Sequence, residues 1–251
     1  MSADRPVGLL TTLGAPLLPL TLRRLLDAGC GPLAVIADAK ELGERDRTFW
    51  QQRTEGAFDA LGIGLHDFAA EPVSFHLVRS HLDEAMLVLL DRLRPPFLVN
   101  AGTPRKLTPP ILAACPQGVL NVHPGILPRY RGANCVEWAI HHDEPVGNSA
   151  HFMTEGYDEG PIIAAETTPL PDPGRYAAIR TAVYAHGIDL MARTVRQLRA
   201  TGLGPADLPP QGEGSRFRAM TPDLLAATIA KANAGRYRPQ QARRRDAIGA
   251  Q

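Results

Sequence analysis

The first half of the chain alternates short apolar runs with longer segments in which leucines recur at helical spacing. Four runs are predicted to be buried strands of a parallel sheet, because they are largely apolar: residues 6–13, 31–39, 96–102 and 118–125. Helices are predicted at residues 17–29, 40–62 with a break near Gly56, 80–95 and, after a loop, within 103–115. Residues 64–70 are interpreted as one further short strand.

Strands alternating with helices predict an α/β fold built on an open, mostly parallel, Rossmann-like sheet with helices on both faces. After residue 125 the pattern changes. A helix is predicted at residues 134–144, a β-hairpin at 146–170 around a turn at 155–160, and a long helix at 175–202. We therefore expect one domain over residues 1–202, followed by a short extension, residues 203–251, that ends in a basic tail.

Charge and cysteine content narrow the functional classes. The chain carries 27 Lys and Arg against 26 Asp and Glu, so nucleic acid and membranes are not expected as partners. Cys30, Cys115 and Cys135 form no CxxC pair, which indicates a reducing, cytoplasmic setting. No apolar stretch reaches the roughly 18 residues that a membrane helix needs. No His/Cys set has the spacing of metal ligands, and no metal is expected.

Two polar side chains interrupt the apolar run in VLNVHPGILPRYRGAN. Asn121 and His123 are two residues apart, so they project from the same face of a strand. In open parallel sheets, sites lie outside the carboxyl ends of the strands, where this pair is predicted to lie. An amide can donate to a developing oxyanion, and an imidazole can transfer a proton near neutral pH. A hydrogen-bonded histidine at a strand terminus, without a chemical role, is an equally good interpretation of these residues alone.

Asp158 lies in the glycine-bounded turn of TEGYDEGPII. Turns commonly carry Asp and Gly for backbone reasons, which is the structural alternative. The apolar strand that follows would hold the carboxylate against the sheet. Near His123 the carboxylate would orient the imidazole and favour the imidazolium. We therefore expect Asp158 to join Asn121 and His123 in one site.

The segment LNVHPGILPRYRGAN, followed by EGYDEGPII, resembles the formyltransferases that use 10-formyltetrahydrofolate. That family includes enzymes for glycinamide ribonucleotide, methionyl-tRNA and amino sugar nucleotides. The resemblance is strong over about residues 90–170 and only general in the preceding α/β half. It implies that Asn121, His123 and Asp158 are catalytic. It also implies that 10-formyltetrahydrofolate is the formyl donor, released as tetrahydrofolate, that no metal is needed, and that residues 1–202 form the catalytic domain.

The resemblance further implies a folate pocket. Its expected lining is Pro104, Arg105, Lys106, Leu107, Gly125, Ile126, Leu127, Pro128, Glu155, Gly156 and Tyr157. Lys106 departs from the family pattern, which has an apolar residue there, and its amine either points to solvent or meets the glutamate tail of the folate. Gly125 stands where the family commonly has serine, so any contact that needs the hydroxyl is lost.

The acceptor is expected to be the amine of a small molecule, either an amino sugar nucleotide or another amine of specialised metabolism. Arg129, Arg131 and Asn134 are expected to bind it, since arginine suits phosphate and carboxylate. Alternatively, Arg129 is exposed and Arg131 only holds its loop. The family's tRNA enzymes add a C-terminal β-barrel, whereas only about fifty residues follow Gly202.

Three other functions stay open at this point: a methionyl-tRNA formyltransferase-like enzyme, a formyltetrahydrofolate hydrolase that admits water, and a folate-binding module without turnover. Formate released without an acceptor would identify the hydrolase. The sequence leaves a homodimer open.

Overall fold

A seven-stranded sheet, in the order β3-β2-β1-β4-β5-β7-β8, carries the fold. The computed structural model describes residues 5–41, 43–171 and 175–239. The strands of this sheet are β1 (Val7–Leu13), β2 (Leu33–Glu41), β3 (Val73–Val78), β4 (Leu98–Asn100), β5 (Val119–His123), β7 (Gly147–Phe152) and β8 (Ile162–Thr167). The helices are α1 (Leu18–Asp27), α2 (Glu44–Thr54), α3 (Glu84–Leu93), α4 (Pro109–Leu112), α5 (Cys135–His141), α6 (Tyr176–Thr201) and α7 (Pro222–Asn233).

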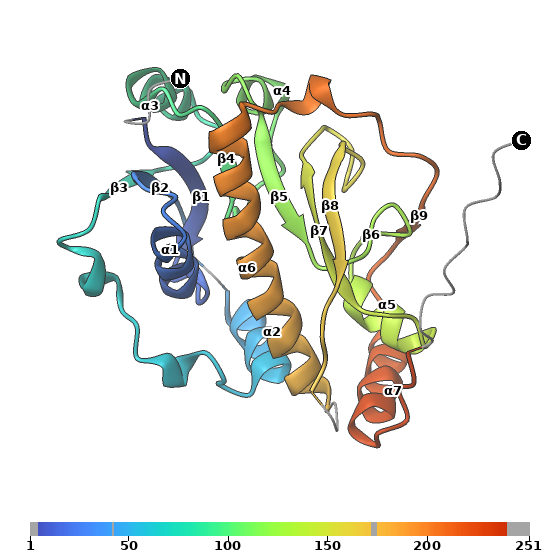
Figure 1. Cartoon of the computed structure of the whole chain (residues 1–251). Coiled ribbons are helices and arrows are strands. Elements are labelled where there is room, and N and C mark those ends of the chain that lie inside the picture. Colours follow the sequence, from blue (N-terminus) through green and yellow to red (C-terminus); the bar gives the residue numbers. More distant parts are fainter. Residues whose placement is uncertain (1–4, 42, 172–174, 240–251) are drawn as a thin grey trace, which may run out of the picture.

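The sheet is parallel from β3 to β5 and antiparallel beyond it. β5 pairs antiparallel with β7, and β7 pairs antiparallel with β8, which forms the expected hairpin before the long helix α6. Helices α1 and α6 pack on one face, and α3 and α4 pack on the other (Figure 1). The predicted open, mostly parallel α/β sheet is confirmed.

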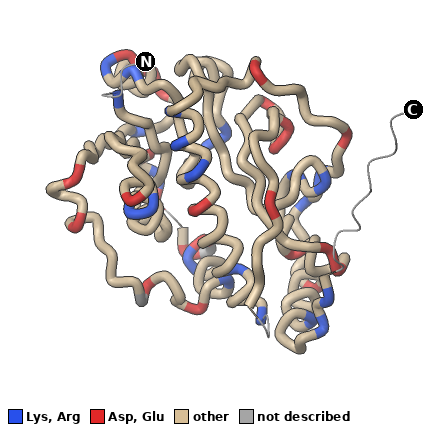
Figure 2. Tube along the Cα trace, in the orientation of Figure 1, with Lys and Arg blue, Asp and Glu red and all other residues tan. Residues whose placement is uncertain are grey.

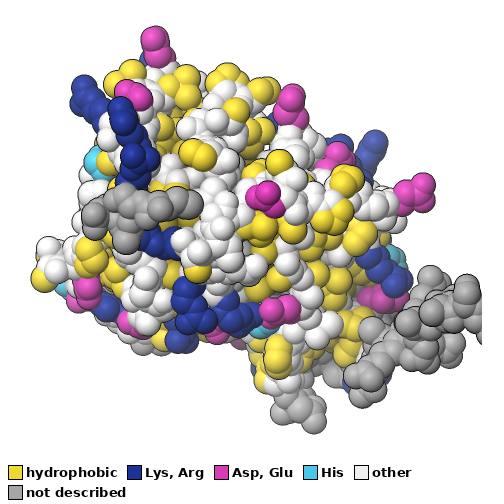
Figure 3. Space-filling model, turned by 45° about the horizontal axis from the view of Figure 1, so that its top comes forward, with side chains coloured by type: hydrophobic (Ala, Val, Ile, Leu, Met, Phe, Trp, Pro, Cys, Tyr) yellow, Lys and Arg dark blue, Asp and Glu magenta, His cyan; other side chains and the backbone are white. Residues whose placement is uncertain are grey.

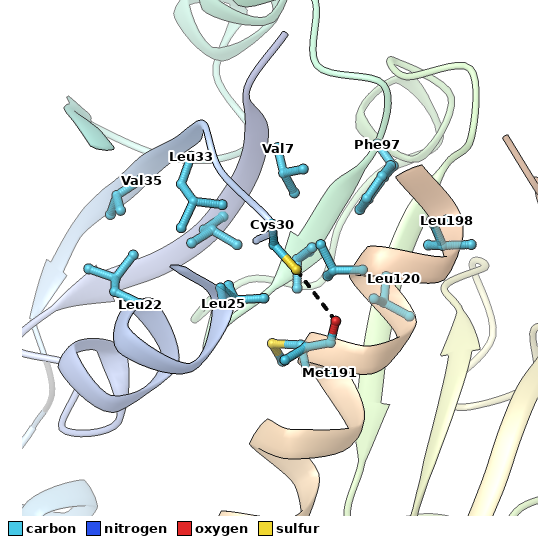
Figure 4. Close-up of a cluster of buried hydrophobic side chains, with 14 of the residues drawn as sticks. Val7, Leu22, Leu25, Cys30, Leu33, Val35, Phe97, Leu120, Met191 and Leu198 are labelled. Atoms are coloured by element: carbon cyan, nitrogen blue, oxygen red, sulfur yellow. Dashed lines mark hydrogen bonds between the residues drawn. The ribbon is translucent and has the colours of Figure 1, made fainter. Parts of the chain in front are cut away.

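The positions of the two hydrophobic cores explain why the central strands are largely apolar. Along β1, Val7 and Leu9 face α1 and α6, whereas Leu10 faces α3 and α4, and all three are fully buried. Side chains from α1, β2 and α6 close the first of these cores (Figure 4). Within it, the Cys30 thiol donates to the carbonyl oxygen of Ala192 at 3.5 Å (Figure 4). Because helices cover both faces of the sheet, its central strands have little exposure to solvent.

One strand prediction was wrong. Residues 64–70 contain a 3-10 helix, Leu65–Phe68, and the edge strand β3 follows at Val73–Val78. Asp67 accepts a hydrogen bond from the backbone N–H of Gly64 at 2.8 Å, which favours a helical turn there. Phe75 and Leu77 lie exposed on the edge strand, so β3 lacks a clean alternation of buried apolar and exposed polar positions.

The segment after α6 lies against the segment after β5. β9 (Ser215–Phe217) pairs parallel with β6 (Tyr130–Gly132) in a second, two-stranded sheet. α7 packs against α5, and Ala232 and Tyr237 join the core cluster around Tyr130. The three consecutive arginines of the basic tail, residues 243–245, lie outside the described residues.

Charged residues of both signs are spread along the chain (Figure 2). On the face that Figure 3 shows, acidic and basic side chains stand among many hydrophobic ones. Within the described residues, no helix has the length and apolar character needed to cross a bilayer. The described His, Cys, Asp and Glu side chains include no group of three placed to hold a metal ion.

Candidate active site

The carboxyl end of β5 brings the predicted polar residues to one place. Asn121 and His123 lie on the same face of β5, and the turn between β7 and β8 carries Asp158 to them. The Nδ1 atom of His123 lies 3.4 Å from Oδ1 of Asp158. The other carboxylate oxygen, Oδ2, accepts the backbone N–H of Gly132 at 2.9 Å. The structure therefore places the amide, imidazole and carboxylate together.

The hydrogen bonds of His123 indicate which nitrogen is basic. Its Nε2 lies 2.8 Å from the carbonyl oxygen of Tyr130, which can only accept. The neutral ring therefore carries its proton on Nε2, and the unprotonated Nδ1 faces Asp158. When Nδ1 takes up a proton, the carboxylate of Asp158 becomes its partner.

Electrostatics set the resting charges of this pair. Burial lowers the pKa of His123 below its ordinary value, and the charge of Asp158 only partly opposes this. Burial would raise the pKa of Asp158, but the nearby rings of His151 and His123 and the hydrogen bond from the N–H of Gly132 outweigh burial and lower that pKa. At neutral pH the pair is therefore a carboxylate beside a neutral imidazole. Asp158 raises the pKa of His123 and so favours the imidazolium, but His123 is only 6% exposed and burial outweighs this effect.

Two residues that sequence analysis missed hold the Asn121 amide. Asn100, at the end of β4, donates from Nδ2 to Oδ1 of Asn121 at 3.0 Å. His151 on β7 lies opposite Asn121 in the antiparallel register, and its Nε2 is 3.0 Å from Nδ2 of Asn121. The same His151 nitrogen lies 3.6 Å from Oδ1 of Asp158. With one N–H of Asn121 directed at His151, the second N–H is available to an oxyanion.

Asn100 had a visible signal, because it is a polar residue at the end of the apolar run 96–102, as Asn121 is in its own run. The Oδ1 atom of Asn100 accepts the backbone N–H groups of Gly102 and Thr103 at 3.1 and 2.9 Å. His151 had no such signal, because its role depends on the register between β5 and β7.

A cavity of about 190 Å³ opens beside these residues. Its lining includes six residues predicted for the folate pocket: Arg105, Lys106, Leu107, Glu155, Gly156 and Tyr157. Asn100, Thr103, Asn121, His151, Met153, Thr154 and Asp158 complete it. Pro104 is not among the described lining residues. Apolar side chains and loop backbone thus meet Asn121 and Asp158 at one opening, and His123 lies directly behind Asp158.

Arg105 is held from behind the cavity by a buried carboxylate. Asp38, which is fully buried, accepts Nε and Nη2 of Arg105 at 2.8 and 2.9 Å. It also accepts the backbone N–H of His81 at 2.9 Å. Burial would raise the pKa of Asp38, but these hydrogen bonds lower it well below its usual range. The guanidinium of Arg105 therefore fixes the loop that lines the cavity.

Removing the charge of Asp38 should destabilise the protein. We expect Asp38→Asn to lower the free energy of unfolding by about 2–3 kcal/mol near neutral pH, because Arg105 loses its partner. Since the pKa of Asp38 is lowered by folding, this difference should shrink as the pH falls below ~4. Denaturant unfolding of both proteins measures it.

The matched control is Asp83→Asn, which removes a carboxylate paired with the exposed Arg79. That variant should lose less than about 0.5 kcal/mol. Equal losses in the two variants would show that the Asp38–Arg105 pair has no special role.

The segment Gly125, Ile126, Leu127 and Pro128, also predicted for the folate pocket, is not brought to this cavity. Its backbone is tied to β7 instead: Ser149 Oγ donates to the carbonyl oxygen of Gly125 at 2.8 Å and accepts the N–H of Leu127 at 2.9 Å. A Cβ on Gly125 would lie 2.7 Å from Nε2 of His123, so this glycine lets the ring approach the loop.

The three residues predicted to bind the acceptor have partners in the protein itself. Arg129 pairs with Glu144 at 2.7 Å and is exposed. Arg131 donates to Oε1 of Gln211 at 2.9 and 3.1 Å and to the carbonyl oxygen of Gly212. Asn134 donates to Glu137 and accepts the N–H of Met220 at 3.2 Å. These contacts match the alternative in which Arg131 holds its loop.

A second, larger cleft of about 630 Å³ adjoins the first. Asn100 and Thr103 line both. The larger cleft lies where β1 and β4 are neighbours, among α1, α2 and α6. Two openings that adjoin at Asn100 and Thr103 provide separate places for two molecules. Cys135, although near His123, is no nucleophile, because burial raises the pKa of its thiol to about 12.

Comparison with known proteins agrees with this architecture. The sequence profile of the family described as formyl transferase matches residues 51–180. A methionyl-tRNA formyltransferase from Syntrophus aciditrophicus (strain SB) is 37% identical over 119 residues, which is 47% of this chain and 38% of that protein. The chain spans less than two thirds of the length of such curated relatives.

Two solved structures share the fold. Glycinamide ribonucleotide transformylase 1 from Symbiobacterium toebii aligns with a TM-score of 0.57 and 22% identity, over 80% of this chain and 90% of that one. A sugar N-formyltransferase from Shewanella sp FDAARGOS_354 aligns with a TM-score of 0.57 and 16% identity, over 90% and 87%. At these identities the likeness establishes the shared fold.

Proposed function

Because this chain belongs to the formyl transferase family, we propose that it moves a formyl group from 10-formyltetrahydrofolate to the amine of a small molecule. The observation that carries the proposal is the convergence of Asn121, His123 and Asp158 beside the smaller cavity, which Asn121 and Asp158 line. A cytoplasmic enzyme of specialised metabolism fits this activity, and an amino sugar nucleotide is one candidate acceptor.

The smaller cavity suits the donor. Leu107 and Met153 offer apolar surface to a flat ring, and the loop backbone around them offers hydrogen bonds to its edge. The donor supplies an activated formyl group on a nitrogen. Asn121, Asp158 and His151 line the same cavity, so a formyl group held there would meet them directly.

The site residues then have distinct tasks. As the amine nitrogen bonds to the formyl carbon, the carbonyl oxygen gains charge, and the free N–H of Asn121 can donate to it. Nδ1 of His123 accepts the proton that the amine loses, and Asp158 stabilises the resulting imidazolium. When the bond to the folate nitrogen breaks, His123 returns the proton to that nitrogen. Atoms and charge balance without a metal.

A screen of amines with 10-formyltetrahydrofolate tests this function. We expect tetrahydrofolate to be released only when a suitable amine is present, with one N-formyl product for each tetrahydrofolate. Formate without an amine would identify a hydrolase instead. Donor binding without any turnover in the whole panel would identify a binding module.

Methionyl-tRNA is a second candidate acceptor, because the relative from Syntrophus aciditrophicus is named a methionyl-tRNA formyltransferase. The same screen should therefore include methionyl-tRNA. Formylation of this tRNA at a higher kcat/KM than any small amine would replace the small-molecule acceptor in our proposal.

Lys106 should have only a small effect on donor binding. Its ammonium lies 5.0 Å from the ring centre of Tyr157, and both side chains are exposed at the cavity. Because exposed cation–π contacts contribute about 0.5–1 kcal/mol, Lys106→Leu should weaken tetrahydrofolate binding less than about fivefold. Fluorescence titration measures this, and a loss above fiftyfold would give Lys106 a direct ligand contact.

A further inference from the structure

The helix N-terminus that borders the larger cleft lacks the features of a phosphate site. In doubly wound folds, phosphates bind to free backbone N–H groups at a helix N-terminus. Here the first turn of α1 borders the cleft, but Leu18 already donates its N–H to Ala15 at 3.1 Å, and Pro19 has no N–H. The N-cap residue Leu17 makes no side-chain hydrogen bond. This turn offers few donors to a phosphorylated acceptor.

The walls of the cleft are largely aromatic and apolar. Trp50 from α2 and Tyr184 from α6 line it, with their ring centres 5.2 Å apart. Ile188 and Met191 of α6 continue the apolar surface. The buried Nε1–H of Trp50 has no hydrogen-bond partner among the described residues. An acceptor with an apolar or aromatic body fits such walls.

One guanidinium stands in this wall. Of the charged residues that line the cleft in the described structure, Arg53 is the cation and Asp46 the anion. Asp46 already accepts the N–H of Gly43 at 3.1 Å as part of the cap of α2. Arg53 has its Nε 3.9 Å from the buried Glu137 and its Nη1 3.4 Å from the hydroxyl of Tyr184. No partner for its Nη2 is found among the described residues.

Glu137 pairs with the guanidinium of Arg53 at its Nε atom and leaves its other N–H groups free of this carboxylate. This carboxylate is fully buried and accepts the hydroxyl of Tyr176 at 2.7 Å. Arg180 lies 3.6 Å from it and provides a second cation. Arg53 is therefore held by this ion pair and by the hydroxyl of Tyr184, and the N–H groups of its Nη2 can meet a ligand carboxylate.

The cleft also borders the donor cavity. Asn100 and Thr103 line both clefts, and Pro124 follows His123 directly. Granting the formyl-transfer function proposed above, we propose that the acceptor is an amino-acid-type amine. Its carboxylate binds Arg53, its apolar or aromatic body lies against Trp50 and Tyr184, and its amine points toward Asn100 and Thr103, beside the donor cavity.

Matched ligand pairs test this assignment. The protein, saturated with tetrahydrofolate, is titrated by calorimetry with L-phenylalanine against phenethylamine and with L-leucine against 3-methylbutylamine. The members of each pair differ only in the carboxylate. We expect at least one amino acid to bind tenfold or more tightly than its partner. Arg53→Met should abolish that difference, whereas Arg47→Met, on the exposed side of the same helix, should preserve it.

Four results would overturn the assignment: no binding by any of the four amines, a carboxylate effect that survives Arg53→Met, tighter binding of a uridine diphosphate amino sugar, or equal weakening of both members of a pair by Arg53→Met. The last result would give Arg53 a merely structural role. Tetrahydrofolate that fails to bind at all would overturn the proposed function, and this inference with it.

Discussion

His123→Ala should lower kcat with the preferred amine by more than a hundredfold, because the variant loses the group that accepts and returns the proton. The ring is buried and held between Tyr130 and Asp158, and alanine removes the basic Nδ1 that faces Asp158. Steady-state release of tetrahydrofolate measures the effect. Tetrahydrofolate binding should change little, since His123 does not line the donor cavity.

The control for this variant is His66→Ala, which removes a histidine that is 85% exposed. Its activity should equal that of the original protein. A His123→Ala protein that is folded and retains more than a tenth of the activity would refute the role of the ring. Because burial lowers the pKa of His123, the acid limb of kcat/KM should also lie below the ordinary histidine value of about 6.5.

Asp158→Asn should lower kcat about a hundredfold or more, because the amide keeps the shape of the side chain but cannot stabilise the imidazolium. The N–H of Gly132, now bonded to Oδ2 of Asp158, can still donate to the asparagine oxygen, so the turn should keep its place. Circular dichroism and thermal unfolding verify the fold, and initial rates measure the loss.

Glu159→Gln is the matched control, since it removes the exposed carboxylate next to Asp158 in the same turn. We expect its rate to stay within a factor of two of the original. If the two variants lose activity equally, the charge of the turn as a whole matters, and a specific pairing of Asp158 with His123 is contradicted.

Periodicity predicted the fold well because central strands and long helices bury continuous apolar surface. The strand β5 with Asn121 and His123, the hairpin and α6 all follow from such patterns. The edge strand β3 was not predicted, because it pairs along only one edge and its apolar residues Phe75 and Leu77 stay exposed. Local patterns do not reveal which apolar run ends at the sheet edge.

The part of the site that lies within one sequence motif was predictable. Residues on one strand share a face by geometry, so Asn121 and His123 could be placed together. His151 and the pair of Asp38 with Arg105 could not, because β-strand register and contacts across loops decide their positions. The neutral resting state of His123 also depends on its burial, which no local pattern states.

Transfer of a labelled formyl group tests the central claim most directly. The protein is mixed with 10-formyltetrahydrofolate carrying ¹³C in the formyl group and with the preferred amine, and the label is followed by nuclear magnetic resonance. The account predicts that the label moves to an N-formyl product, and that His123→Ala and Asp158→Asn slow this transfer about a hundredfold or more. Label that appears only as formate, or that moves equally fast in both variants, would contradict it.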